Sequence, residues 1–98
     1  MIKVLIVEDE IPAQLTLRRL IERCGPDSHI DEMHTSVKAT IKWLEENPDG
    51  AAVIFMDVEL SDGICFEIFE HINPSAQVII TTAYDNYALN AFKINSVD

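Results

Sequence analysis

Side chains that can hold a metal ion or attack phosphorus follow three separate apolar segments of the 98-residue chain: Glu8 and Asp9, then Asp57, then Thr82. Three carboxylates within a few ångströms of one another repel strongly where the local dielectric constant is low. Such a cluster therefore needs protons or a cation to persist, and its all-oxygen ligands suit Mg²⁺ or Mn²⁺.

The aspartate after the second strongly apolar segment also suggests covalent chemistry. A carboxylate such as that of Asp57 can act as a nucleophile toward phosphorus and form an acyl phosphate. A bound cation would offset the charge of the two anions that meet, and the Thr82 hydroxyl could hydrogen-bond the new phosphoryl oxygens. We interpret the side chains of Glu10, Glu59 and Asp62 as helix caps or solvated loop residues, although the backbone carbonyl of Glu59 could still reach the metal.

The elements that must position these residues alternate along the chain. Apolar, β-branched runs predict buried strands, and a more polar run predicts an edge strand; these strands are expected at 2–7, 29–34, 51–56 and 78–81. Apolar residues at spacings of three and four predict helices between them. Pro12 fits the first turn of the first helix, Ser36 can cap the second, and Asp85 can cap a fourth.

This β-α-β-α-β-α-β-α order predicts a parallel sheet covered by helices on both faces. In open sheets of this kind, ligands bind outside the carboxyl ends of the strands. If the first, third and fourth strands are neighbours, Glu8, Asp9, Asp57 and Thr82 converge at one edge. A carboxylate after a strand is also common as a helix cap or a solvated loop residue, but coincidence at three strand ends favours a site.

Composition narrows the function further. The net charge is −10, from 17 acids and 7 bases, which argues against direct binding of nucleic acid and favours cationic partners. No apolar run approaches the roughly 18 residues needed to span a membrane, and the N-terminus does not resemble a signal peptide. We therefore expect a single cytoplasmic domain, with Cys24 and Cys65 as two buried free thiols.

Three short motifs in this order resemble the receiver domain of two-component response regulators: Val7-Glu8-Asp9-Glu10, Phe55-Met56-Asp57 and Thr82-Ala83. Residues 81–92 look more narrowly like receivers of the LytTR type (LytR/AlgR), which are usually joined to a C-terminal LytTR DNA-binding domain. The resemblance covers the whole chain. It implies a flavodoxin-like (CheY-like) doubly wound parallel sheet with strand order 2-1-3-4.

The resemblance also implies roles for individual residues. Asp57 matches the phospho-accepting aspartate, Asp9 a direct metal ligand, and Glu8 an acidic neighbour that acts on the metal through water. Glu59 matches the position whose backbone carbonyl binds Mg²⁺, and Thr82 the hydroxyl residue that moves toward the phosphoryl group. The family takes its phosphoryl group from a sensor histidine kinase and signals rather than acting as an enzyme. A homodimer of the full-length protein is the expected assembly.

Two departures from the family pattern stand out. Residues 57–63 form a compact segment without the proline that many receivers have there, which we interpret as variation. The chain also stops at Asp98, where the family continues into a fifth strand, an aromatic switch residue, a phosphoryl-contacting lysine and a last helix. Lys93 lies within the fourth helix pattern and is not expected to replace that lysine. Residues 1–98 are thus expected to be a receiver domain incomplete at its C-terminus, with DNA bound only through a further domain.

Three other functions fit parts of the pattern. A receiver-like interaction domain that is never phosphorylated would share the fold and lack the lysine. A Mg²⁺-dependent phosphatase of the haloacid-dehalogenase type would use Asp57 as nucleophile and Glu59 as a second acid. A flavin or nucleotide binder would need a phosphate-cradling loop after the first strand, where Glu8, Asp9 and Glu10 would repel phosphate unless a metal intervened.

Overall fold

A computed structural model describes residues 1–30 and 32–81. The expected fourth helix, Thr82, Ala83 and Lys93 lie outside the described residues. The described elements are, in order, β1 (Ile2–Val7), α1 (Ile11–Cys24), β2 (Ser28–His34), α2 (Val37–Glu46), β3 (Val53–Met56), β4 (Glu59–Leu60), β5 (Gly63–Ile64), α3 (Phe66–His71) and β6 (Gln77–Ile80).

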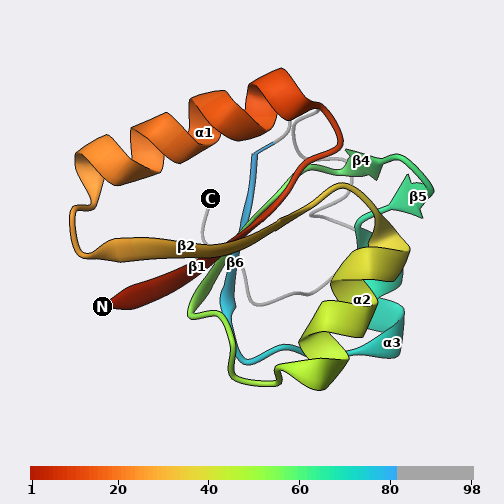
Figure 1. Ribbon diagram of the computed structural model, residues 1–98. Coiled ribbons are helices and arrows are strands. Elements are labelled where there is room, and N and C mark those ends of the chain that lie inside the picture. Colours follow the sequence, from red (N-terminus) through yellow and green to blue (C-terminus); the bar gives the residue numbers. More distant parts are fainter. Residues whose placement is uncertain (82–98) are drawn as a thin grey trace.

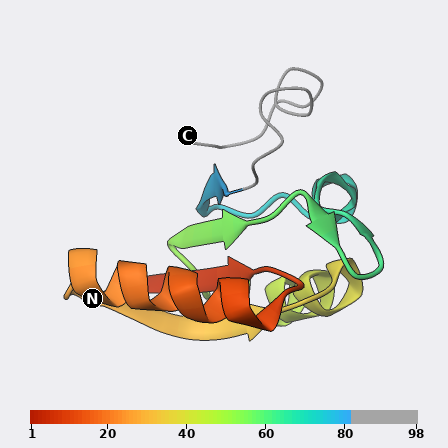
Figure 2. The same cartoon turned by 90° about the horizontal axis from the view of Figure 1, so that it is seen from above.

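The four longer strands form one parallel sheet in the order β2-β1-β3-β6. Figure 2 shows this order from yellow β2 at one edge to blue β6 at the other. The pairs Val7–Met56 and Met56–Ile80 bring the carboxyl ends of β1, β3 and β6 to the same edge. The expected flavodoxin-like strand order, with β2 as an edge strand, is confirmed.

Helices cover both faces of the sheet, with α1 on one side and α2 and α3 on the other (Figure 1). Successive residues of β1 divide the core between these faces, as the period of two of a strand requires. Val4 and Ile6 pack with Ile21 of α1. Leu5 and Val7 join the larger cluster beneath α2 and α3. The four residues are at most 2% exposed, which explains why β1 has a continuous apolar sequence.

The predicted ends of α1 and the predicted cap of α2 agree with the structure. Pro12 lies in the first turn of α1, and α1 ends before Gly25. The Ser36 hydroxyl accepts the backbone N–H of Ala39 at 3.1 Å and caps α2. No helix among residues 1–81 is long and apolar enough to cross a lipid bilayer.

The segment between β3 and α3 differs from expectation. Residues 60–63, expected to be a loop, contribute to an antiparallel hairpin in which Glu59 pairs with Ile64 and Leu60 with Gly63. Ile64, expected on the inner face of a helix, is 43% exposed in this hairpin, and α3 begins only at Phe66. Gly63 has a backbone φ of 158°, a conformation that residues with a side chain rarely adopt. The periodicity of the sequence does not reveal it.

The expectation of two buried thiols is wrong for one cysteine. Cys65 is buried, whereas Cys24 at the end of α1 is exposed. Cys24 lies beside an apolar groove of about 410 Å³ between α1 and the sheet, lined also by Leu20, Phe55 and Ile79. Apolar spacing identified the correct side of α1, but described residues do not cover that side completely.

Candidate metal centre

Three carboxylates meet at the carboxyl edge of the sheet. Glu8 and Asp9 follow β1, and Asp57 follows the neighbouring strand β3. One oxygen from each side chain lies within 4.8 Å of the other two. The Asp57 N–H donates to the Val7 carbonyl at 2.9 Å, so the ladder between the strands continues to the acidic residues. The structure therefore brings together three of the residues selected from the sequence.

Glu8 is the buried member of this cluster, with 8% of its surface exposed. Burial raises the pKa of its carboxyl from 4.5 to about 7; the N–H of Glu10 opposes the shift, and the negative charge of Asp57 adds to it. At neutral pH the metal-free cluster thus retains a proton for part of the time. A hard divalent cation could replace that proton, and the three oxygen donors fit Mg²⁺ or Mn²⁺.

Asp57 is partly buried and held by its own loop. The N–H of Val58 donates to Asp57 Oδ1 at 2.8 Å, which orients the carboxylate. Cys65 is buried, and this burial, with a smaller contribution from the charge of Asp57, raises the pKa of the Cys65 thiol to about 12. Cys65 is therefore a neutral packing group, and Asp57 is the candidate nucleophile.

Gln14 contributes to the site and was missed in the sequence. Its side chain is 4% exposed, and its amide donates to the carbonyl oxygens of Glu8 at 2.8 Å and His34 at 3.3 Å. One buried amide thus joins α1 to the ends of β1 and β2. A signal was present, because Gln14 lies three residues before Leu17 and seven before Ile21, on the apolar side of α1.

The remaining candidates have different positions. Glu59 begins β4 two residues after Asp57, and its side chain is exposed, as expected. Asp62 is exposed, and of the two expected roles it is a helix cap, because its carboxylate accepts two backbone N–H groups of α2. At the end of β6, the Thr81 N–H donates to the Met56 carbonyl at 2.9 Å. The described residues end there, so the position of Thr82 stays a prediction.

Known proteins resemble the chain in sequence and in fold. No protein-family model matches the chain. It is 37% identical over 102 residues to the sensory transduction protein LytT of Bacillus cereus, covering 100% of this chain and 40% of that protein. It is 34% identical to LytT of Bacillus subtilis, covering 100% of this chain and 41% of that protein. The chain thus spans about two fifths of the length of these relatives.

Solved structures with the same fold include a LuxR-family DNA-binding response regulator from Staphylococcus aureus. The TM-score is 0.81 at 19% identity, over 98% of this chain and 83% of that one. RcsB from Salmonella enterica, bound to a promoter in the presence of phosphomimetic BeF3−, gives a TM-score of 0.74 at 20% identity, over 92% of this chain and 52% of that one.

The relatives and the parallel sheet point to one class: the chain has the receiver-domain fold of response regulators, and over its whole length its sequence resembles part of the LytT relatives. Within that class, its sequence is similar to about two fifths of the LytT sensory transduction proteins.

Proposed function

We propose that the chain accepts a phosphoryl group on Asp57 from a sensor histidine kinase and so switches an attached output domain. The observation that carries the proposal is the convergence of the Glu8, Asp9 and Asp57 oxygens within 4.8 Å at the carboxyl edge of the sheet. In this proposal Asp9, Asp57 and the Glu59 carbonyl bind Mg²⁺, or Mn²⁺ in its place, and Glu8 acts through water. Thr82 is the proposed switch hydroxyl.

The chemistry is a displacement at phosphorus by one Asp57 carboxylate oxygen. As the new O–P bond forms, the P–N bond of the phosphohistidine breaks, and the imidazole leaves with its electron pair. Bound Mg²⁺ would supply the positive charge that lets two anions approach. The Val58 N–H holds Asp57 Oδ1 at 2.8 Å and orients the carboxylate during attack. The chain thereby carries a signal without turning over a substrate.

The proposal extends to the rest of the protein. RcsB, which shares the fold, was solved with a phosphomimetic, and the same chemistry is proposed for this chain. We assign residues 1–98 to a cytoplasmic receiver domain, and propose that the full-length protein forms a homodimer and regulates transcription through a C-terminal LytTR DNA-binding domain. The length of the LytT relatives leaves room for such a domain.

Intact-mass measurement tests the acceptor directly. The chain is incubated with a small phosphoryl donor, acetyl phosphate or phosphoramidate, with Mg²⁺ or with a chelator. We expect a mass increase of one phosphoryl group that requires Mg²⁺ and is absent from Asp57→Asn. Asp27→Asn, which changes an exposed aspartate between α1 and β2, is the matched control and retains the increase.

Other results would favour another function. Wild-type protein that stays unmodified with both donors would favour an interaction domain that is never phosphorylated. Continuous hydrolysis of a phosphate ester would favour a phosphatase with Asp57 as nucleophile. Modification that persists in Asp57→Asn would show that another residue is the acceptor.

A further inference from the structure

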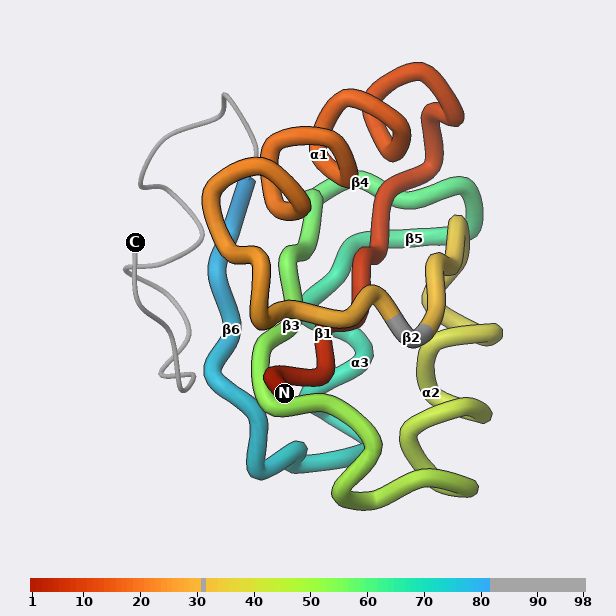
Figure 3. Tube along the Cα trace, turned by 60° about the vertical axis from the view of Figure 1, so that its left-hand side comes forward, coloured from red at the N-terminus to blue at the C-terminus, as the bar shows by residue number. Residues whose placement is uncertain are grey.

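The hairpin that follows Asp57 is bonded to the start of α2, a helix about 25 residues earlier in the sequence. Asp62 Oδ1 accepts the Val37 N–H at 2.6 Å, and Asp62 Oδ2 accepts the Lys38 N–H at 3.1 Å. The Ser61 N–H and hydroxyl both donate to the Thr35 carbonyl, at 3.3 Å and 3.1 Å. We call these four hydrogen bonds the Asp62 latch. Figures 1 and 3 show β5 passing close to the start of α2.

The latch does more than cap the helix. Helix α2 has a local cap, because Ser36 accepts the N–H of Ala39 through its hydroxyl and that of Thr40 through its carbonyl. The two N–H groups left at the start, those of Val37 and Lys38, could bond to water. Instead they hold a carboxylate from another segment, and the Val37 N–H lowers the pKa of Asp62 below 3.8. The helix dipole favours the same negative charge.

The hairpin transmits this constraint to the metal centre. Only four residues lie between Asp57 and Asp62 in the sequence, and one of them is Glu59 in β4. The strands pair at Glu59–Ile64 and Leu60–Gly63, and the Cys65 N–H donates to the Val58 carbonyl at 2.8 Å. Val58 and Leu60 are buried, which anchors the near side of the hairpin in the core. The Asp62 latch fixes the far side.

We propose that Asp62 is a positioning residue for the metal centre. By holding the hairpin against α2, it sets the position of the Glu59 backbone and of Asp57, although its own carboxylate touches neither the metal nor the phosphoryl group. The role of the Glu59 carbonyl in this inference rests on the proposed function. Metal affinity should therefore depend on a carboxylate that faces α2 rather than the acidic cluster.

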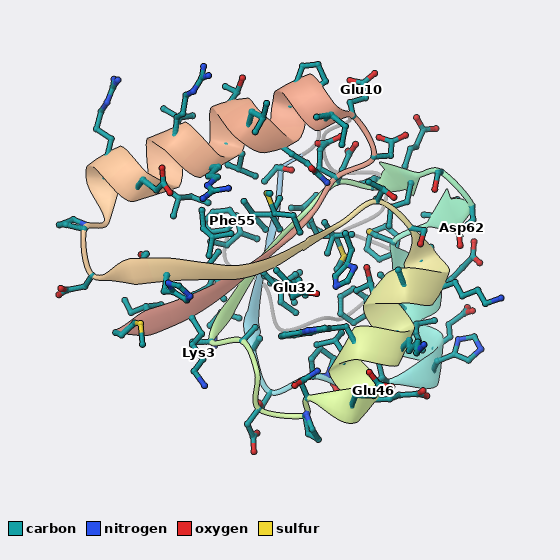
Figure 4. All side chains as sticks on the ribbon, viewed as in Figure 1. Lys3, Glu10, Glu32, Glu46, Phe55 and Asp62 are labelled. Carbon is teal, nitrogen blue, oxygen red and sulfur yellow. The ribbon has the colours of Figure 1, made fainter. Side chains whose placement is uncertain are left out.

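The test compares Asp62→Ala, Asp62→Asn and Glu46→Ala. Asp62→Asn retains one carbonyl acceptor for the latch. Glu46→Ala removes an equal charge from the opposite end of the same helix, as the labelled side chains in Figure 4 show. Mg²⁺ affinity is measured by NMR titration without a phosphoryl donor, and amide hydrogen exchange at Val37 and Lys38 reports the latch itself.

We expect Asp62→Ala to need on the order of tenfold more Mg²⁺ for half-saturation, as for other residues that orient ligands from outside the coordination sphere. The Mg²⁺ affinity of Asp62→Asn should lie between those of Asp62→Ala and wild type, and the affinity of Glu46→Ala should match that of wild type. At saturating Mg²⁺, phosphorylation of Asp62→Ala should recover most of the wild-type rate. A purely structural role would lower thermal stability but leave the Mg²⁺ affinity of the folded protein unchanged.

The inference is overturned if the amide hydrogens of Val37 and Lys38 exchange rapidly in Asp62→Ala, yet this variant binds Mg²⁺ with the affinity of wild type. It also fails if wild-type protein binds no Mg²⁺ at millimolar concentration. Mg²⁺ binding that depends on Asp62, in a protein whose Asp57 accepts no phosphoryl group, would support the latch and reject only the proposed phosphoryl transfer.

Discussion

The side-chain amide of Gln14 lies 2.8 Å from the backbone carbonyl oxygen of Glu8, in the buried corner where α1 meets the end of β1. The same amide reaches the carbonyl of His34 at 3.3 Å. The His34 carbonyl also accepts the Glu8 N–H at 2.9 Å, so Glu8 is held through both of its backbone polar groups. A single buried side chain therefore supports the residue that begins the acidic cluster.

Gln14→Leu should destabilise the protein by about 1–3 kcal/mol, because it leaves the Glu8 carbonyl without its amide donor in a buried position. Urea denaturation measures this loss, and Arg19→Leu, at an exposed position of the same helix, is the control. If both variants unfold at the same urea concentration as wild type, the hydrogen bond from the Gln14 amide to the Glu8 carbonyl contributes no net stability.

Glu8→Gln should change how the stability of the metal-free protein depends on pH. The pKa of Glu8 is about 7 in the folded protein and 4.5 in its ordinary state. Between these values the folded state binds more protons than the unfolded state, so this group makes stability fall as pH rises from 4.5 to 7 and adds no further change above that. Gln has no proton to lose, so the variant should lack this fall.

Thermal unfolding in a chelator at several pH values tests this prediction. At about pH 8 the Glu8→Gln protein should be more stable than wild type by on the order of 2 kcal/mol, and near pH 4 the two should agree. Mg²⁺ should stabilise wild type more than the variant, because the variant lacks a carboxylate. Glu10→Gln changes the exposed neighbour and serves as control; equal pH profiles for wild type and Glu8→Gln would contradict the assigned pKa.

Much of the fold followed from local sequence. Residues 2–7 are apolar without alternation because β1 is covered on both faces, and the acids begin where that cover ends. The parallel topology then required Glu8, Asp9 and Asp57 to meet at one edge. These features depend on short-range patterns, which a single sequence contains, and on a rule that holds for parallel sheets in general.

Features that depend on distant partners were not predictable. The sequence allowed Asp62 to be a helix cap or a solvated loop residue but did not indicate which helix it would cap, because its partners, Val37 and Lys38, lie 25 and 24 positions away. The strands of the hairpin are two residues each, too short for any periodicity to show. Cys24 looked buried because an apolar stripe shows which side of a helix faces inward, but not where its cover stops.

The two cysteines should differ sharply in reactivity. Cys24 is exposed, whereas Cys65 is buried and its pKa is raised to about 12, so Cys65 offers neither access nor thiolate to a reagent. A chromogenic disulfide reagent at neutral pH should modify one thiol rapidly in the native protein and the second only in denaturant. Cys24→Ser should abolish the rapid phase, and a rapid phase that survives this change would place Cys65 at the surface.

Gly63→Ala should destabilise the hairpin mainly through the backbone. Gly63 has φ +158°, and an added Cβ would lie 2.6 Å from Oε2 of Glu67, whose carboxylate accepts the Ile64 N–H at 3.0 Å. The carboxylate is the far end of a flexible side chain and can move, whereas the backbone conformation cannot change without breaking the Leu60–Gly63 pair. We expect a loss of about 1–3 kcal/mol.

A double-mutant cycle with Glu67→Ala separates the two causes of that loss. If backbone strain dominates, the effects of Gly63→Ala and Glu67→Ala on the free energy of unfolding, measured by urea denaturation, should add to within about 0.5 kcal/mol. If the contact with Glu67 dominates, the double variant should be more stable than the sum of the single changes. Mg²⁺ titration of Gly63→Ala extends the test to the site: because the hairpin carries Glu59, a strained hairpin should bind Mg²⁺ more weakly, whereas unchanged affinity would separate its geometry from the metal centre.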